Sequence, residues 1–338
     1  MTSESSTVVA VEGVALRRQR LVTATTGATS YAVVAFLVGL CVVFAVALPG
    51  RFLTGQNIQA VLGDQAVPGI LALAVMLPLI AGKFDLSAAA TLGFTSVFVA
   101  WATGVHQLST PAAIVLAVLI GAVVGLANSF VVEGVGVNAF IATLGMGTIL
   151  AGGNLLLTQG TILFKGVPLD LKNLGQGRLL GVPAPFYVFL ICALVLWYAI
   201  EMTPAGRRLR ATGLARDAAR LTGVRTSRFV TIAFVGAGAL AALAGVLQTG
   251  RTGSAPPDVG PSFLLPAYAA AFLGAATIRR GSFNVWGTVV GTFVLGVGLN
   301  GLSLLGAPFW VPPVFSGIAL IAAVSFSVVV ERRSRSVG

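Results

Sequence analysis

Residues 111–132 read PAAIVLAVLIGAVVGLANSFVV, and this stretch decides the class of fold. It contains no charged residue. Its length suits a helix that crosses a bilayer, because the hydrocarbon core is about 30 Å thick and each helical residue rises about 1.5 Å. Its Ala, Val, Leu and Gly content favours a helix, whereas a membrane β-barrel needs alternating strands of about ten residues. We therefore predict a transmembrane helix here.

The rest of the chain has the same apolar character. Of its 338 residues, 57% are hydrophobic and 9% are charged, whereas a soluble domain carries about 25% charged residues. Pro261 and Pro266 interrupt the weakest apolar run, at 263–278, which is either a full span or a re-entrant segment. We predict an all-α, polytopic membrane protein with about ten transmembrane helices, or nine if this run does not cross. The runs are 30–48, 57–80, 86–103, 111–132, 139–157, 184–203, 227–250, 263–278, 283–303 and 309–330.

The positions of the basic residues predict the orientation, because Lys and Arg accumulate in short cytoplasmic loops. With ten spans and the N-terminus inside, 16 of the 21 Lys and Arg residues are cytoplasmic. An odd number of spans would place one terminal arginine group outside. We therefore predict two cytoplasmic tails, at 1–29 and 331–338, around a single transmembrane domain at 30–330. No aromatic and basic platform accompanies the charge of +11, so no nucleic-acid partner is expected.

The chain offers little material for catalysis. It has no G-x-x-x-x-G-K-[ST] phosphate loop, no H-E-x-x-H and no G-x-S-x-G. Its cysteines, Cys41 and Cys192, lie in apolar runs, and His106 is the only histidine. We predict that the chain is not an enzyme and that it binds no metal or cofactor.

Two loops are long. We expect 158–183 to be an external loop with little regular structure, which either contacts a partner or only connects two spans. The second, 202–228, reads MTPAGRRLRATGLARDAARLTGVRTSR and contains seven arginines. It predicts an amphipathic helix of about two turns, with Gly213 and Gly223 as helix breakers. Either the arginines anchor this helix to anionic lipid, or its alanine face docks on a cytosolic protein.

Polar residues inside the spans are candidates for a solute path, because ionisable groups at membrane depth usually face an interior or a cavity. Asp85 and Ser87 also suit the role of caps for the helix that follows them. Uncharged polar groups in apolar helices mostly form hydrogen bonds between helices, so only a minority are expected to line a path. The candidates are Asp64, Asp85, Asn138, Phe140, Thr143, Asn154 and Asn300.

Glycines spaced by four residues predict close helix packing. Examples are Gly121 with Gly125 and Gly287 with Gly291. Four apolar runs at 57–157 and four at 227–330 are also compatible with a pair of inverted repeats, which many transporters contain.

Three blocks of sequence carry a resemblance to a known family. In their order and spacing they resemble the permeases of ribose-type ATP-binding-cassette (ABC) importers, over residues 57–325. The sequence differs from the family pattern at Lys83, at Ala88–Ala89 and at Asn138–Ala139. The blocks are Asn57 to Ile80 followed by GKFDLS at 82–87; VNAFIATLGMGTILAGG at 137–153; and TPAGRRLRATGLARDAARLTGV at 203–224, leading through LAALAGVL at 240–247 to RRGSFNVWGTVVGTFVLGVGLNGLSLLG at 279–306.

The resemblance implies a multi-pass permease of the bacterial inner membrane that imports a ribose-like monosaccharide or a polyol. The implied partners are a cytosolic ABC ATPase that uses ATP and Mg²⁺, an extracytoplasmic sugar-binding protein, a second permease copy or a paralogue, and the lipid bilayer. It also implies that the loop at about 204–226 couples the permease to the ATPase. The coupling residues would be Arg207, Gly213, Arg216, Asp217, Ala218, Ala219, Arg220 and Gly223.

Other classes of transporter remain open from the sequence. A permease for branched-chain amino acids or nucleosides has a related fold and a different cargo. An autonomous secondary transporter or channel would need essential ionisable residues deep in the bundle, and Asp64 is the best candidate for that role. A membrane enzyme lacks a visible catalytic set.

Overall fold

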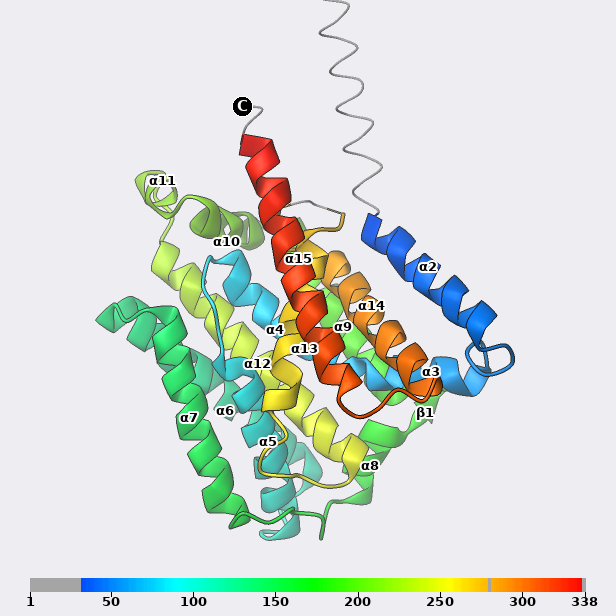
Figure 1. The fold of residues 1–338 in the computed structure, drawn as a ribbon. Helices are drawn as coiled ribbons and strands as arrows, with labels where there is room; N and C mark the ends of the chain where they lie inside the picture. Colours follow the sequence, from blue (N-terminus) through cyan, green and yellow to red (C-terminus); the bar gives the residue numbers. More distant parts are fainter. Residues whose placement is uncertain (1–31, 279–280, 336–338) are drawn as a thin grey trace, which may run out of the picture.

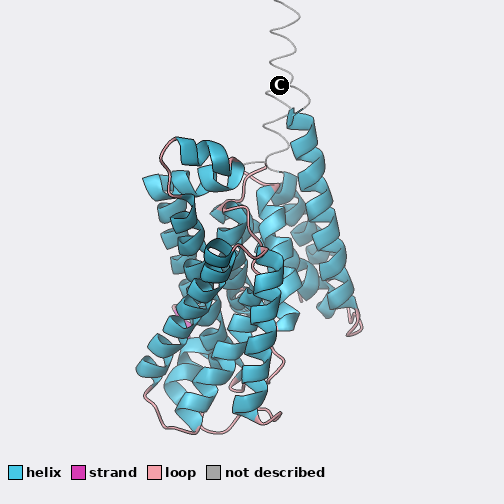
Figure 2. Cartoon of the chain, turned by 90° about the vertical axis from the view of Figure 1, so that its left-hand side faces the viewer, coloured by secondary structure: helices cyan, strands magenta, loops and turns pink. Residues whose placement is uncertain are grey.

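A computed structural model describes residues 32–278 and 281–335 of the chain. The predicted tail at 1–29 and the last three residues lie outside this range. Helices run side by side in a bundle (Figures 1 and 2). The only sheet in the described part is a hairpin of two strands, each of two residues. The first half contains α2 (Ala32–Ala47), α3 (Gly55–Asp64), α4 (Ala66–Ile80), α5 (Ser87–Gly104), α6 (Thr110–Ser129), the π-helix η1 (Phe130–Val135) and α7 (Ala139–Thr158).

The second half begins with the segment that follows α7. It contains α8 (Leu169–Gln176), β1 (Arg178–Leu179), β2 (Val182–Pro183), α9 (Ala184–Trp197), the π-helix η2 (Tyr198–Met202), α10 (Pro204–Leu214), α11 (Arg216–Leu221), α12 (Thr226–Thr252), α13 (Pro261–Ala275), α14 (Val285–Leu304) and α15 (Val311–Arg335). Each of the ten predicted apolar runs therefore coincides with one helix or one helical pair.

Six helical segments of the described chain are long and apolar enough to cross a membrane. They are Gly55–Ile80, Thr110–Val135, Ala139–Thr158, Ala184–Met202, Thr226–Thr252 and Val285–Leu304, and α2, α13 and α15 contribute shorter apolar segments. The predicted class, a polytopic helical membrane protein, is confirmed. The number of ten crossings stays a prediction, as does the complete crossing of the membrane by α13.

One predicted run is broken within the helix. The run at 57–80 forms α3 and α4, which meet at Gln65. Pro68 explains the break, because it has no N–H group to donate to the carbonyl of Asp64 four residues earlier.

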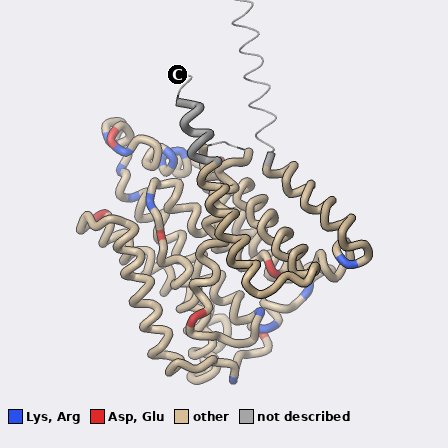
Figure 3. The backbone as a smooth tube through the Cα atoms, in the orientation of Figure 1, with Lys and Arg blue, Asp and Glu red and all other residues tan. Residues whose placement is uncertain are grey.

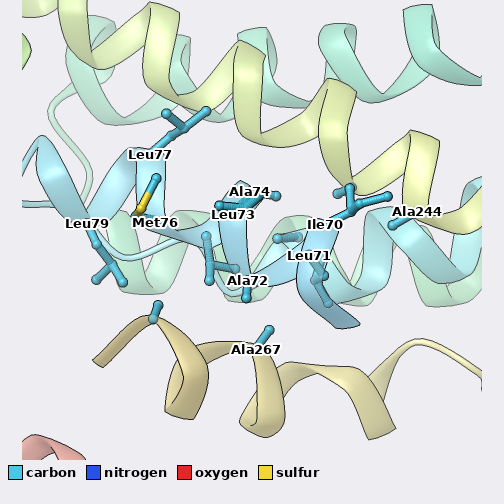
Figure 4. Close-up of a cluster of buried hydrophobic side chains, with 14 of the residues drawn as sticks. Ile70, Leu71, Ala72, Leu73, Ala74, Met76, Leu77, Leu79, Ala244 and Ala267 are labelled. Carbon is cyan, nitrogen blue, oxygen red and sulfur yellow. The ribbon is translucent and has the colours of Figure 1, made fainter. Parts of the chain in front are cut away.

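The centre of the bundle is α4, whose side chains are buried on every face apart from the half-buried Pro68. Ala244 of α12 and Ala267 of α13 lie on opposite sides of it (Figure 4). Since lipid is as apolar as these side chains, their burial stabilises the fold mainly through close packing.

Glycines bring helix backbones together, as their spacing predicts. A Cβ atom at Gly121 would lie 2.2 Å from the carbonyl oxygen of Gly238, and one at Gly125 would lie 2.1 Å from that of Phe234, so α6 and α12 pack with backbones in contact. Gly291 of α14 faces the carbonyl of Ala270 in α13 at 2.3 Å in the same way.

The helices form two groups of four, α4–α7 and α12–α15, and each group contributes one helix that packs mainly against the other group. In the first group α5 packs on α7, and in the second α13 packs on α15. Across the groups, α12 packs on α5 and α6, whereas α4 packs on α13 and α14. A non-helical segment leads into both α5 and α13 (Figure 1). This reciprocal packing supports the prediction of two related four-helix units, which we call unit one (α4–α7) and unit two (α12–α15).

The prediction for 158–183 is wrong in part, because the segment contains regular structure. Helix α8 buries Leu171 completely and packs against α12, and β1 pairs with β2 through Arg178–Pro183 and Leu179–Val182. Helix α8 is short and mostly polar, and Leu171 is the main apolar residue that it buries. A helix this short gives no clear hydrophobic periodicity in the sequence.

The prediction for the 202–228 loop is also wrong in one respect. Gly213 does not break a helix, because α10 continues through it to Leu214. Its missing Cβ serves packing, since that atom would lie 2.0 Å from the carbonyl oxygen of Ile80. Gly223 does follow the end of α11, with a φ of 84°, as predicted. We call α10 and α11 together the α10–α11 segment.

Candidate functional site

The connection between α4 and α5 brings polar groups into the bundle. Gly82 has a φ of 74° and turns the chain after α4, and residues 83–86 are non-helical. Asp85 lies two residues before the start of α5, and its Oδ1 accepts hydrogen bonds from the Ser87 N–H at 3.0 Å and the Ser87 hydroxyl at 2.6 Å. Of the two predicted caps, Asp85 is confirmed, whereas Ser87 is the first residue of α5 and donates to Asp85.

Asp85 and its neighbours connect four helices. The backbone N–H of Asp85 donates to the Tyr268 hydroxyl of α13 at 3.0 Å, and the amide of Asn128 in α6 donates to the Ser87 hydroxyl at 2.7 Å. The Thr143 hydroxyl of α7 accepts from the Leu86 N–H at 3.0 Å. All five side chains are buried, and we call them the Asp85 cluster: Asp85, Ser87, Asn128, Thr143 and Tyr268.

The Asp85 cluster connects the two units at the beginning of α5. Such buried polar bonds fix the position of a helix end, because each broken bond leaves a polar group without water. Tyr268 was not among the residues predicted from the sequence. Its neighbours in the chain are apolar, and nothing in them indicates that its hydroxyl has a hydrogen-bond partner. The cluster can therefore hold α5 and α13 in register.

A second polar position lies further along α7. The amide of Asn154 donates to the carbonyl of Pro257, in the segment before α13, at 3.0 Å. Its oxygen is buried and has no hydrogen-bond partner among the described residues. Asn154 thus links unit one to the non-helical segment that precedes α13.

A cavity of about 450 Å³ opens beside the non-helical segment before α5. Two predicted path residues line it: Asn138, which accepts a hydrogen bond from the Phe140 N–H and so caps α7, and the half-exposed Phe140. The lining residues are Gly82, Lys83, Phe84, Val132, Glu133, Gly136, Val137, Asn138, Ala139, Phe140 and Arg216.

Glu133 lies at the centre of an ion-pair group in this cavity. Arg216 binds both of its carboxylate oxygens, one of them at 3.0 Å from Nη1, and the Lys83 ammonium lies 3.8 Å away. The Glu133 side chain is only 6% exposed. Sequence reasoning missed Glu133, although a lone carboxylate directly after the apolar run 111–132 was a usable signal.

The other two predicted path residues lie apart from the Asp85 cluster. Asp64 is 55% exposed and pairs with Arg251 at 3.0 Å, close to the break between α3 and α4. Asn300 of α14 forms a reciprocal amide pair with Asn57 of α3, at 3.0 and 2.9 Å. Their place on a solute path stays a prediction.

The amide pair gives a test of helix contacts. We expect Asn300→Leu to lower the free energy of unfolding by about 1 kcal/mol, within the range for polar contacts between membrane helices, because it removes the donor to the Asn57 side-chain oxygen and leaves the Asn57 NH2 group with the Phe52 carbonyl alone. Thermal unfolding in detergent measures the change. The double variant Asn57→Leu with Asn300→Leu is expected to be closer to the parent than Asn300→Leu alone. A single variant as stable as the parent would contradict a contribution of this pair.

The α10–α11 segment presents its polar residues at one end of the bundle. Lys and Arg gather around it (Figure 3). Arg207, Asp217, Ala218, Arg220 and Leu221 are exposed, whereas Ala219 is buried against the rest of the chain. The exposed Leu214 and Leu221 give this surface more apolar character than the predicted alanine face.

The class of the protein follows from comparison with known proteins. Residues 57–324 match the family described as the branched-chain amino acid transport system permease component. The chain belongs to this permease family. The matched region contains the Asp85 cluster, the cavity beside Glu133 and the α10–α11 segment, so these features lie in the part of the permease that the family shares.

The permease is similar to named transporters over most of its length. It is 32% identical over 293 residues to the ribose import permease protein RbsC of Escherichia coli (strain K12). The aligned region covers 85% of this chain and 91% of that protein. It is 33% identical over 264 residues to the autoinducer 2 import system permease protein LsrD of Yersinia enterocolitica, which covers 76% and 78%. The predicted resemblance to ribose-type permeases is confirmed. No solved structure gives a significant match.

Proposed function

We propose that this permease is the membrane subunit of an ABC importer that carries a ribose-like monosaccharide or a related polyol across the bacterial inner membrane. The observation that carries the proposal is similarity to a ribose import permease across 85% of the chain. In this proposal a separate cytosolic ATPase uses ATP and Mg²⁺, the permease itself binds no cofactor, and an extracytoplasmic sugar-binding protein delivers the cargo. A second permease copy or a paralogue completes the dimer.

The proposed orientation places the α10–α11 segment in the cytoplasm, with ten crossings and both termini inside. The distribution of charge supports it. The α10–α11 segment lies at one end of the bundle, where Glu133 pairs with Lys83 and Arg216. Arg251 does not belong to this group, because it pairs with Asp64 and donates to the carbonyl of Gly63. A high density of arginine in one short loop is typical of the cytoplasmic side.

The proposed ATPase contact gives a direct test. We expect Asp217→Lys and Gly223→Trp each to lower capture of the cognate ABC ATPase by about tenfold, or about 1.4 kcal/mol. Asp217 is an exposed carboxylate on α11, so lysine reverses the charge of the contact surface. Gly223 has a φ of 84°, which tryptophan adopts only with strain, so α11 should be displaced. Pull-down from detergent, with stability measured in parallel, gives the answer.

The matched control is Asp170→Lys, which makes the same charge reversal on the exposed face of α8. It should leave ATPase capture unchanged. If both α11 variants captured the ATPase as well as the parent, the assignment of α11 as the ATPase contact would be wrong.

The family description supports a second cargo, a branched-chain amino acid. Uptake into proteoliposomes that contain the permease, its ATPase and its binding protein separates the two cargoes. ATP-dependent uptake of labelled ribose without uptake of labelled leucine supports the sugar proposal, and the reverse result supports the amino-acid cargo.

A further inference from the structure

The α10–α11 segment lies across the ends of both four-helix units. It follows α9, which precedes unit two in the chain, yet it is bonded to both units through two arginines six residues apart. Each arginine holds a carboxylate that is almost completely buried: Glu133 is 6% exposed and Glu201 is 7% exposed. The segment therefore has a separate polar attachment to each unit.

The first attachment is Arg216, at the start of α11. Its guanidinium binds both oxygens of Glu133, which lies between α6 and α7 of unit one. Glu133 also pairs with Lys83, in the segment that leads from α4 into α5. A two-point bond between a guanidinium and a carboxylate fixes orientation as well as distance, so movement of α11 is transmitted to this part of unit one.

The second attachment is Arg210, near the end of α10. Its Nη1 donates to the Ser282 hydroxyl at 2.5 Å and to the Phe283 carbonyl at 2.9 Å, and both residues lie between α13 and α14 of unit two. Its Nη2 binds the carboxylate of Glu201 in η2. Through these three bonds the Arg210 guanidinium connects η2, which precedes the α10–α11 segment, to the connection between α13 and α14 of unit two.

The two attachments reach connections between helices in both units. Glu133 lies between the third and fourth helices of unit one, whereas Ser282 and Phe283 lie between the second and third helices of unit two. Movement of the segment can therefore reach both units through groups that are buried and fixed in geometry. Contiguous hydrogen bonds and ion pairs of this kind carry coupling energy between elements that can change arrangement.

We propose that Arg216 and Arg210 are positioning residues that transmit movement of the α10–α11 segment separately, Arg216 to unit one and Arg210 to unit two. This inference rests on the proposed function, in which an ATPase moves the segment. The arginines connect the ATPase contact to the two halves of the solute path, and neither of them contacts ATP.

The test reads each unit independently in the complete permease–ATPase complex in nanodiscs. In a parent with Cys41→Ala and Cys192→Ala, single reporter cysteines are placed outside the apolar helices, at the exposed positions Gln159, directly after α7, and Phe309, just before α15. The rate of maleimide labelling is measured without nucleotide and with ATP, Mg²⁺ and vanadate. In the parent, we expect nucleotide to change the rate at both reporters.

Two double variants remove each attachment without leaving either member of its arginine–carboxylate pair as a lone buried charge. Lys83, which also loses Glu133, is 26% exposed. Arg216→Met with Glu133→Gln is expected to lose the nucleotide-dependent change at Gln159→Cys and to retain it at Phe309→Cys. Arg210→Met with Glu201→Gln is expected to show the opposite loss. Arg228→Met, which removes an exposed arginine of α12 outside the segment, should retain both changes.

Retention of both changes in the two double variants overturns the inference, and so does the loss of both changes in either variant while the ATPase remains bound. ATPase capture is measured in the same samples. A parent that captures no ATPase contradicts the proposed function itself, and with it the inference. Normal capture and coupled changes in the parent, with no selective loss in the variants, overturn the inference alone.

Discussion

Gly125→Leu is expected to lower the melting temperature of the permease by roughly 10 °C or to leave the chain aggregated. The leucine Cβ would lie 2.1 Å from the carbonyl oxygen of Phe234, so α6 and α12 must separate along their contact. Gly121 and Gly238 lie on the same contact and lose their close approach as well. Overpacking costs about 3 kcal/mol at the upper end of its usual range, and about 1 kcal/mol corresponds to roughly 3 °C for a protein of this size.

The measurement is thermal unfolding in detergent together with size-exclusion chromatography. Gly39→Leu is the matched control, because a Cβ at Gly39 of α2 meets no atom within 4 Å. That variant should melt with the parent. A Gly125→Leu permease that melts at the parent temperature would show that α6 and α12 are not held by backbone contact.

Asp85→Leu is expected to abolish transport and to lower the free energy of unfolding by about 1–3 kcal/mol. The substitution removes the acceptor for the Ser87 N–H and hydroxyl in a buried site, and the remaining donors have no water to replace it. The start of α5 would then shift relative to Tyr268, and the two units would lose their polar connection beside the proposed solute path.

Asp85→Asn separates the capping role from the charge, because its side-chain oxygen can still accept from Ser87. We expect this variant to keep most of the stability of the parent. Asp170→Leu makes the same change at an exposed position of α8 and should alter neither property. Uptake into proteoliposomes and thermal unfolding measure the two effects. Equal stability of Asp85→Leu and the parent would contradict the structural role of the cluster.

Local features of the fold were predictable because they depend on neighbouring residues only. The capping of α5 by Asp85 is an example, since the carboxylate and the Ser87 N–H are two residues apart. The turn after α11 is another, because Gly223 can adopt a positive φ whatever surrounds it.

Features that depend on a distant partner were not predictable. Gly213 was expected to break the helix, but it lies inside α10, where the carbonyl oxygen of Ile80, far away in the chain, approaches it closely. Glu133 gave only the signal of a lone charge beside an apolar run, and its partner Arg216 is 83 residues away. Tyr268 gave no signal, because its contact with Asp85 exists only once α13 packs beside α5.

The amino-acid sequence by itself determined the membrane class, the ten helical runs and the family resemblance. The preference of a helix for lipid is a sum over about 20 consecutive residues, so it can be read without knowing the partners of that helix. Only the tertiary structure decided which polar groups meet. It brought the Asp85 cluster together from four helices and connected the α10–α11 segment to both units through Arg210 and Arg216. Such contacts depend on the angles and distances between helices, which cannot be inferred from the amino-acid composition of each helix.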